Sequence, residues 1–335
     1  MADAFAFGLD TFGDVTRSAD GTLLPQARVL RDVVEEAALA DSLGLDAFGV
    51  GEHHRPDFAI SAPEVMLAAI ASRTRQILLG SAVTVLSTDD PVRVFQRFST
   101  LNAVSNGRAE VILGRGSFTE SYALFGYDLS RYGELFEEKL ARFAALLEEG
   151  QAIATPPIET GRLRAWIGVG GSPESVVRAA RYGLPLTLAI IGGNPLRFRP
   201  YADLYREALG RMGRPLLPVA VHSPGHVAPT DDEARDELWP HYEAMINRIG
   251  AERGWPPTTR DHFEREAGPD GALCVGSPQA VADKIVRTSR RLDLSRFNLK
   301  YSAGTLPHDA LMRSIELIGT EVAPRVREML TRSAG

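Results

Sequence analysis

The sequence Ala47-Phe48-Gly49-Val50-Gly51-Glu52-His53-His54-Arg55-Pro56 carries a short apolar run into a segment with one acidic residue and two histidines. Segments of helical period lie on both sides of this run, at Gln26–Leu43 and Pro63–Arg73. This alternation is typical of repeated strand, crossover and helix units, and it predicts a parallel sheet. Because functional side chains gather at strand ends in such proteins, the Glu-His-His triplet is a candidate for a site.

The same alternation continues through the chain and amounts to about eight units. The expected strands are Ala4–Leu9, Ala47–Gly51, Ile77–Val85, Ala109–Leu113, Ala165–Val169, Leu186–Ile190, Leu217–His222 and Phe297–Tyr301. The expected helices are Gln26–Leu43, Pro63–Arg73, Pro91–Val104, Tyr132–Glu149, Pro173–Tyr182, Tyr201–Met212, Asp231–Arg248, Pro278–Leu292 and Leu311–Leu330. Eight units in this length predict a (β/α)8 TIM barrel, which takes about 250 residues before insertions, with an open doubly wound sheet as the alternative.

Two stretches exceed what the repeating units need. One follows the fourth expected strand, at Arg115–Arg131, and the other, Gly250–Leu273, is rich in proline, glycine and charge. Long loops in compact domains are usually functional or mobile, so residues 250–273 are a candidate lid. No segment reads as a linker, and residues 1–335 are expected to form a single TIM-barrel domain.

Composition restricts the function classes. The 335 residues are 44% hydrophobic and 24% charged, with a formal charge of −6 and a pI near 5.7, which gives no broad basic surface for nucleic acid. No apolar run approaches the roughly 20 residues that span a bilayer. The residues Met1–Phe5 do not resemble a secretion signal, and the one cysteine, Cys274, cannot form an internal disulfide. These features favour the cytoplasm.

A glycine pair follows the fifth expected strand, in Val169-Gly170-Gly171-Ser172-Pro173-Glu174-Ser175. Ser172 can cap the helix that Pro173 begins, and the glycines let backbone N–H groups approach a ligand closely. The segment therefore predicts an anion site in which Ser172 and Ser175 add hydroxyl donors, although a plain capped turn gives the same pattern. It is neither a Walker loop nor a dinucleotide-binding fingerprint.

Arg115 strengthens the case for an anion. It stands between Gly114 and Gly116 at the end of another expected strand, so no neighbouring side chain crowds its guanidinium. A guanidinium can bind two phosphate oxygens at once. A surface arginine in a flexible turn is the alternative.

The Glu-His-His triplet has two functional interpretations. A metal site is disfavoured because consecutive strand residues point to opposite faces, and no other histidine or cysteine pair has ligand spacing. A neutral His53 can instead act as a general base or hydrogen-bond donor, with Glu52 orienting it or contacting the ligand. A histidine that only satisfies loop carbonyls also remains open.

Six motifs, in their order along the chain, resemble those of bacterial luciferase-like (LLM class) flavin-dependent monooxygenases. They are Gly51-Glu52-His53-His54, Leu79-Gly80-Ser81-Ala82-Val83, Asp90-Pro91-Val92-Arg93, Ser105-Asn106-Gly107-Arg108, Gly114-Arg115-Gly116 and Gly170-Gly171-Ser172. The resemblance covers nearly the whole chain, is densest between residues 44 and 190, and rests on the joint order of motifs that are individually weak.

The resemblance implies a TIM barrel that binds FMN at the carboxyl ends of its strands, with His53 as the catalytic histidine. The implied phosphate ligands are Arg115, Gly170, Gly171, Ser172 and Ser175, which the anion argument reached independently. The implied ring contacts are Phe7, Glu52, Phe118 and the backbone of Ala82 and Val83, whose peptide bond is cis in relatives. No resident metal is implied.

The expected activity is that of a two-component monooxygenase, which uses reduced FMN from a separate flavin reductase and O2 to oxygenate a small organic substrate. Gly114 stands where the light-emitting enzyme has a reactive cysteine, so luminescence with long-chain aldehydes is not expected. The resemblance also implies a homodimer, formed through helices such as Pro63–Arg73.

Three alternatives to this activity stay open: a deazaflavin (F420)-dependent dehydrogenase or reductase, a non-enzymatic flavin-binding protein, and a flavin-free barrel acting on phosphorylated metabolites. The sequence does not identify the substrate. The substrate side of the pocket is expected to be a mixed, mainly apolar and aromatic cavity. The residues expected to line it are Thr11, Phe12, Phe58, Tyr122, Ile191 and Trp255.

Overall fold

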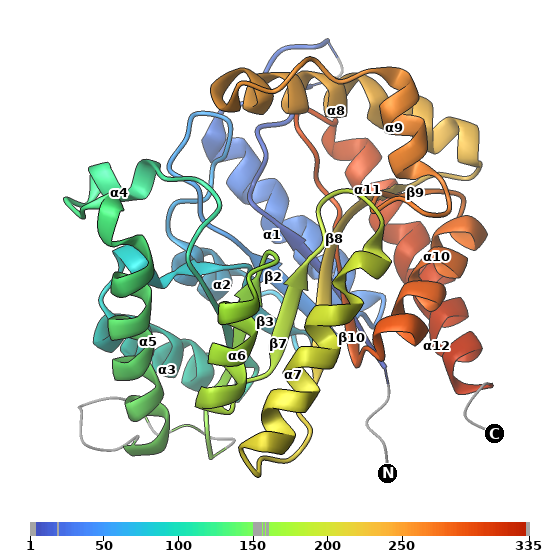
Figure 1. The fold of residues 1–335 in the computed structure, drawn as a ribbon. Coiled ribbons are helices and arrows are strands. Elements are labelled where there is room, and N and C mark those ends of the chain that lie inside the picture. Colours follow the sequence, from blue (N-terminus) through green and yellow to red (C-terminus); the bar gives the residue numbers. More distant parts are fainter. Residues whose placement is uncertain (1–4, 19, 150–155, 157, 159–160, 333–335) are drawn as a thin grey trace.

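Eight parallel strands close into a barrel in the computed structural model, which describes residues 5–18, 20–149, 156, 158 and 161–332 (Figure 1). The strands, in order around the barrel, are β1 (Ala6–Thr11), β2 (Ala47–Val50), β3 (Leu78–Ser81), β5 (Ala109–Gly114), β6 (Arg164–Val169), β7 (Leu186–Ala189), β8 (Val219–Val227) and β10 (Arg296–Lys300). Pairing of β10 with both β8 and β1 closes the ring. The predicted TIM barrel is confirmed, and the open sheet is excluded.

Helices surround the barrel and bury apolar faces against it. They are α1 (Gln26–Ser42), α2 (Pro63–Ala71), α3 (Pro91–Val104), α4 (Glu120–Leu124), α5 (Tyr132–Glu149), α6 (Pro173–Tyr182), α7 (Arg199–Arg211), α8 (Asp231–Arg253), α9 (Arg260–Ala267), α10 (Pro278–Leu292), α11 (His308–Leu317) and α12 (Ala323–Thr331). Helices α8 and α9 lie together across the upper end of the barrel in Figure 1. No helix in the described ranges has the length and hydropathy needed to cross a bilayer.

Two boundaries show why local sequence signals worked. Ser172 accepts a hydrogen bond from the Ser175 N–H and starts α6, and Gly183, at φ 62°, ends it in the left-handed region. Bounds of α3, α5, α6 and α10 agree with those expected from the sequence.

Two strands differ from their predicted bounds. The expected strand Ile77–Val85 is divided into β3 and β4 (Thr84–Val85), and the division falls at the Ala82-Val83 peptide bond, which is cis. The strand expected to end at His222 continues to Val227 because its second half pairs with a short strand, β9 (Cys274–Gly276). Ser-Pro-Gly in that half reads locally as a loop, and the tertiary pairing overrides it.

The predicted loop Gly250–Leu273 is only partly a loop. Helix α8 continues to Arg253 and ends at Gly254, whose φ is 69°. Helix α9 then begins behind Thr259, whose hydroxyl accepts a hydrogen bond from the His262 N–H. The capping residue Thr259 is visible in the sequence, but the nearby prolines and charged residues are typical of a loop and made the helix hard to predict.

Candidate active site

Arg115 and the start of α6 leave the barrel side by side. Strands β5 and β6 are parallel neighbours with Leu113 opposite Ile167, so the residues that follow each strand emerge at the same edge. The Ser172 hydroxyl donates to the Glu174 carboxylate at 2.7 Å. That hydrogen bond is the largest cause, and the charge of Arg115 a smaller one, of a lowered pKa at Glu174. We call Arg115, Gly170, Gly171, Ser172 and Ser175 the β5–β6 edge.

Tyr132, at the start of α5, fixes the arginine of this edge. The Arg115 guanidinium lies 4.9 Å from the centre of the Tyr132 ring, and the Tyr132 hydroxyl donates to the Gly116 carbonyl at 3.1 Å. Within the described residues, the Arg115 side chain forms no ion pair. The guanidinium is therefore held in place while its charge stays available to an anion. Sequence reasoning missed Tyr132, because it lies 17 residues beyond Arg115 in the chain.

The backbone of the β5–β6 edge has room for a phosphate. No atom lies within 4 Å of the position that a side chain at Gly170 would occupy, and Gly171 has φ +117°, which favours glycine. The first turn of α6 also offers N–H groups without helical partners and the positive end of the helix dipole. An open glycine backbone, a helix N-terminus and a poised guanidinium fit a phosphorylated cofactor.

The Ser175 hydroxyl is less accessible to an anion than the sequence predicts. Its side chain is buried, and its hydroxyl accepts a hydrogen bond from Arg178 at 3.1 Å. Arg178 is itself bound to Glu137 on α5. Arg178 thus brings a second positive charge close beneath the start of α6, which no motif had indicated.

The Ala82-Val83 peptide bond rests on two glycines at the ends of β5 and β6. A side chain at Gly114 would stand 2.5 Å from Val83 Cγ2, and one at Gly168 would stand 3.0 Å from Val83 Cγ1. The contact at Gly114 is closer than real side chains allow, and the contact at Gly168 is tight enough that Val83 would have to shift by a few tenths of an ångström. Ala82 and Val83 remain partly exposed between buried neighbours, as a surface for a flat ring would have to be.

His53 lies in an aromatic cluster at the end of β2. Its ring centroid is 4.6 Å from those of Phe12 and Phe58 and 4.8 Å from that of Phe118. We call these four residues the histidine cluster. Burial is the main cause that lowers the pKa of His53 to about 3. His53 is therefore neutral near pH 7 and can donate or accept a hydrogen bond.

Glu52 is oriented toward His54, which corrects the expectation that it orients His53. Its carboxylate lies 3.4 Å from His54 Nε2 and accepts a 2.6 Å hydrogen bond from the Val85 N–H. This contact with Glu52 is the main cause that raises the pKa of His54. The adjacent histidines thus face different partners, although β2 ends at Val50 and neither histidine lies on a strand.

A polar network behind the histidine cluster was not foreseen. At the end of β1, Asp10 lies 2.8 Å from His222 Nδ1, and its other oxygen is buried without a partner. The ammonium of Lys300 on β10 lies 3.0 Å from Asp14 and 4.9 Å from the centre of the Phe12 ring. The expected strands had shown these residues near strand ends, but only the closed barrel brings β1, β8 and β10 together.

Other predicted contacts lie apart from the histidine cluster. Phe7 is fully buried against Phe297, four residues before the carboxyl end of β1, so its position does not support contact with a ring at the mouth. Tyr122 is buried 5.6 Å from the Tyr132 ring, while Ile191 and Trp255 are exposed. Thr11 is buried and contacts Ser302.

The end of α8 covers the histidine cluster. The Phe118 ring lies between the guanidinium groups of Arg55, at 4.6 Å, and Arg253, at 5.0 Å. Arg55 also forms a two-fold ion pair with Glu252, and Arg253 donates to the Ser117 carbonyl at 3.0 Å. The cover consists of charged side chains that can separate without breaking an apolar core.

Comparison with known proteins identifies relatives over most of the chain. The model of the family described as luciferase-like monooxygenase matches residues 11–296. The 4-hydroxyprotoasukamycin monooxygenase of Streptomyces nodosus subsp. asukaensis is 35% identical over 328 residues, or 90% of this chain and 88% of the relative.

Solved structures with the same fold include enzymes that differ in cofactor. Monooxygenase RslO1 from Streptomyces bottropensis has a TM-score of 0.81, with 21% identity over 95% of this chain and 99% of that chain. The oxygenating constituent of 3,6-diketocamphane monooxygenase from Pseudomonas putida, solved with FMN, has a TM-score of 0.77. Its sequence identity is 19%, over 96% of this chain and 99% of that chain. The coenzyme F420-dependent tetrahydromethanopterin reductase of Methanopyrus kandleri has a TM-score of 0.71. Its sequence identity is 17%, over 96% of this chain and 99% of that chain.

Proposed function

The chain belongs to the luciferase-like monooxygenase family and is an enzyme, and on this premise we propose that it is an FMN-dependent monooxygenase. It takes reduced FMN from a separate flavin reductase and uses O2 to oxygenate a small organic substrate. The observation that carries the proposal is the adjacency of Arg115 and the Gly170–Ser172 turn on neighbouring strands β5 and β6.

The β5–β6 edge supports FMN rather than an unphosphorylated flavin. Arg115 would bind two phosphate oxygens, and the N-terminal turn of α6 with the Ser172 hydroxyl would bind the others. Glu174 now accepts the Ser172 hydroxyl hydrogen and is exposed, so its side chain can turn away when a dianion arrives. The position of Ala82 and Val83 beside β5 supports their role beneath the ring.

Bound reduced FMN would supply the electrons and the site of oxygen activation. His53, neutral because of its burial, would hold or accept a proton beside the reacting ring. Phe12, Phe58 and Phe118 would keep water from that histidine. His222, whose ring centre lies 6.2 Å from that of Phe12, and its partner Asp10 would face the substrate.

The end of α8 is the part of the predicted lid that contacts the site. Its Arg55–Glu252 pair and the stacking of Arg253 on Phe118 would open to admit ligands and re-form over them. This proposal narrows the lid from residues 250–273 to the last turn of α8.

A homodimer is supported by the outer face of α2. Val65 is 69% exposed, and Ala68 and Ala69 are exposed one turn further along the helix, so they form an apolar stripe. We expect light scattering to give the mass of two chains, and Val65→Lys to give the mass of one. A monomeric wild type would remove this part of the proposal.

The test of function compares two reduced cofactors in the intact enzyme. Reduced FMN or reduced F420 is supplied with 18O2 and a panel of small organic compounds, and mass spectrometry follows label incorporation. We expect labelled product with reduced FMN only. Hydride transfer from reduced F420 to the organic compound without label would instead identify a deazaflavin-dependent reductase, as the fold shared with the Methanopyrus reductase allows.

A further inference from the structure

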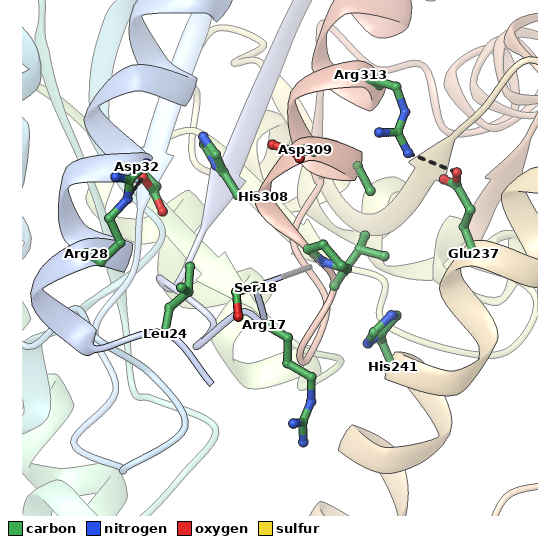
Figure 2. Close-up of a pocket in the computed structure, with 13 residues that line it drawn as sticks. Arg17, Ser18, Leu24, Arg28, Asp32, Glu237, His241, His308, Asp309 and Arg313 are labelled. Atoms are coloured by element: carbon green, nitrogen blue, oxygen red, sulfur yellow. Dashed lines mark hydrogen bonds and ion pairs between the residues drawn. The ribbon is translucent and has the colours of Figure 1, made fainter. Parts of the chain in front are cut away.

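A second cavity lies away from the β5–β6 edge. It has a volume of about 570 Å3 and is walled by α1, by the segment that precedes α1, by α8 and by the start of α11. Figure 2 shows Asp32 on α1 near His308 at the start of α11, with Arg17 and His241 further along the wall. The residues of the β5–β6 edge and of the histidine cluster do not line this cavity.

Three potential metal ligands converge beside this cavity, and two of them, Asp32 and His308, line it. Asp32, Glu35 and His308 each offer one ligand atom, and these atoms lie within 4.8 Å of one another. Asp32 and Glu35 are three residues apart on α1, so they share one face of the helix. His308 comes from the opposite side of the cavity, and its Nε2 lies 4.0 Å from a Glu35 oxygen.

Glu36 holds His308 in a ligating orientation. Its Oε1 lies 2.8 Å from His308 Nδ1, and its Oε2 accepts a hydrogen bond from the buried Tyr301 hydroxyl. A histidine that donates its Nδ1 proton to a carboxylate presents the lone pair of Nε2 to the opposite side. This arrangement of carboxylate and histidine is the usual outer shell of a protein-bound metal.

Asp32 provides independent support for a missing cation. Its side chain is only 3% exposed, and one oxygen accepts a 2.7 Å hydrogen bond from Arg28. The other oxygen, Oδ2, is buried and has no hydrogen-bond partner. A buried carboxylate oxygen without a partner is costly, and a metal ion is one group that would satisfy it.

We propose that Asp32, Glu35 and His308 bind one divalent transition-metal ion of the zinc type. An imidazole with two carboxylates suits zinc, cobalt or nickel, whereas magnesium and calcium prefer oxygen ligands alone. Three protein ligands leave a fourth position of a tetrahedral site for water or another small ligand. The ion would also link α1 to α11, two elements that are distant in sequence.

The test titrates the full-length protein with Zn2+ alone and with Co2+ alone, by calorimetry and by the visible absorption of bound cobalt. We expect one ion per chain. We expect Glu35→Gln and His308→Gln to weaken binding at least tenfold, by analogy with losses on removing metal-orienting groups. Glu35 is exposed and half-solvated, so its substitution leaves the fold intact.

Two matched variants distinguish this site from others. Glu316→Gln on α11 and His262→Gln on α9 change exposed residues outside the cavity and are expected to bind metal like the wild type. Equal binding by Glu35→Gln, His308→Gln and the wild type would overturn the proposal, as would the absence of saturable binding by the wild type. An anomalous-scattering peak between Asp32 and His308 in zinc-soaked crystals is the expected structural result, and its absence counts against the site.

Discussion

The β5–β6 edge and the histidine cluster differ in almost every physical property. The edge is partly exposed and polar, and it uses backbone groups, a hydroxyl and the charge of Arg115. The cluster is mostly aromatic, and its one polar member, His53, is kept neutral. The contrast suggests a division of roles. The edge is suited to bind the phosphate of a cofactor, and the cluster is suited to act on the reactive ring while adding little to the affinity for the cofactor.

The largest effect should come from the cluster. Replacement His53→Ala removes the proton-handling group, and we expect product formed per O2 consumed to fall on the order of a hundredfold, within the range known for general acid–base groups. FMN affinity should stay within about twofold, because His53 is not among the residues proposed to bind the phosphate. Oxygen-electrode and product assays measure both quantities.

His262→Ala, an exposed histidine on α9, is the control for this change and should leave the coupling of oxygen use to product intact. An His53→Ala enzyme that remained fully coupled would show that the cluster only packs the mouth of the barrel.

At the edge, Arg115→Ala should weaken FMN binding by at least about a hundredfold, since two charge-assisted hydrogen bonds at the lower end of roughly 1.5 kcal/mol each total about 3 kcal/mol. Riboflavin affinity should not change. Flavin fluorescence titrations measure both, with Arg291→Ala on α10 as an exposed control. Parallel losses for FMN and riboflavin would mean that Arg115 supports the fold rather than the phosphate.

The pH dependence of the free energy of unfolding should test the burial of His53 without any ligand. In the unfolded chain His53 titrates near its ordinary value of 6.5, whereas burial lowers its pKa to about 3 in the fold. Between these values the unfolded chain binds the extra proton, so this histidine makes the fold less stable as pH falls from 6.5 toward 3.

His53→Gln should therefore lose less free energy of unfolding than the wild type between pH 7 and pH 4, as measured by urea titration. His54, whose pKa is raised by Glu52, has the opposite sign: its contribution is complete below pH 6.5 and disappears as pH rises through its folded pKa. An identical acid response in His53→Gln and wild type would argue against a buried neutral imidazole.

The smallest effect concerns the carboxylate at the edge. Glu174→Gln removes a negative charge that Ser172 now binds, and we expect FMN affinity to rise a few fold because the phosphate is no longer repelled. The gain should shrink at high salt, because Glu174 is exposed. Weaker FMN binding in this variant would indicate that Glu174 helps to position the Ser172 hydroxyl.

Much of the barrel could be predicted because its signals are local. Proline after a capping serine and glycine at a left-handed position gave the bounds of α6. The elements that the sequence did not predict, β9 and α9, depend on tertiary contacts. β9 pairs with the end of β8, and α9 lies in a segment rich in proline and charge, where the local sequence is ambiguous.

The two regions also differ in how far the sequence revealed them. The β5–β6 edge consists of short contiguous motifs, so the sequence alone predicts that Arg115, Gly170, Gly171 and Ser172 belong to one anion site. The surroundings of His53 come from three separate loops, so the orientation of Glu52 toward His54 and the Asp10–His222 pair could not be read from spacing. Contacts between distant segments appear only when the barrel closes.

The central claim is that the β5–β6 edge binds the phosphate of FMN. The most direct measurement is a paired titration of the cofactor-free wild type with FMN and with riboflavin, which differ only in that phosphate. We predict that FMN binds at least about a hundredfold more tightly and that Arg115→Ala removes most of the difference. Equal affinities for the two flavins in the wild type would contradict the account.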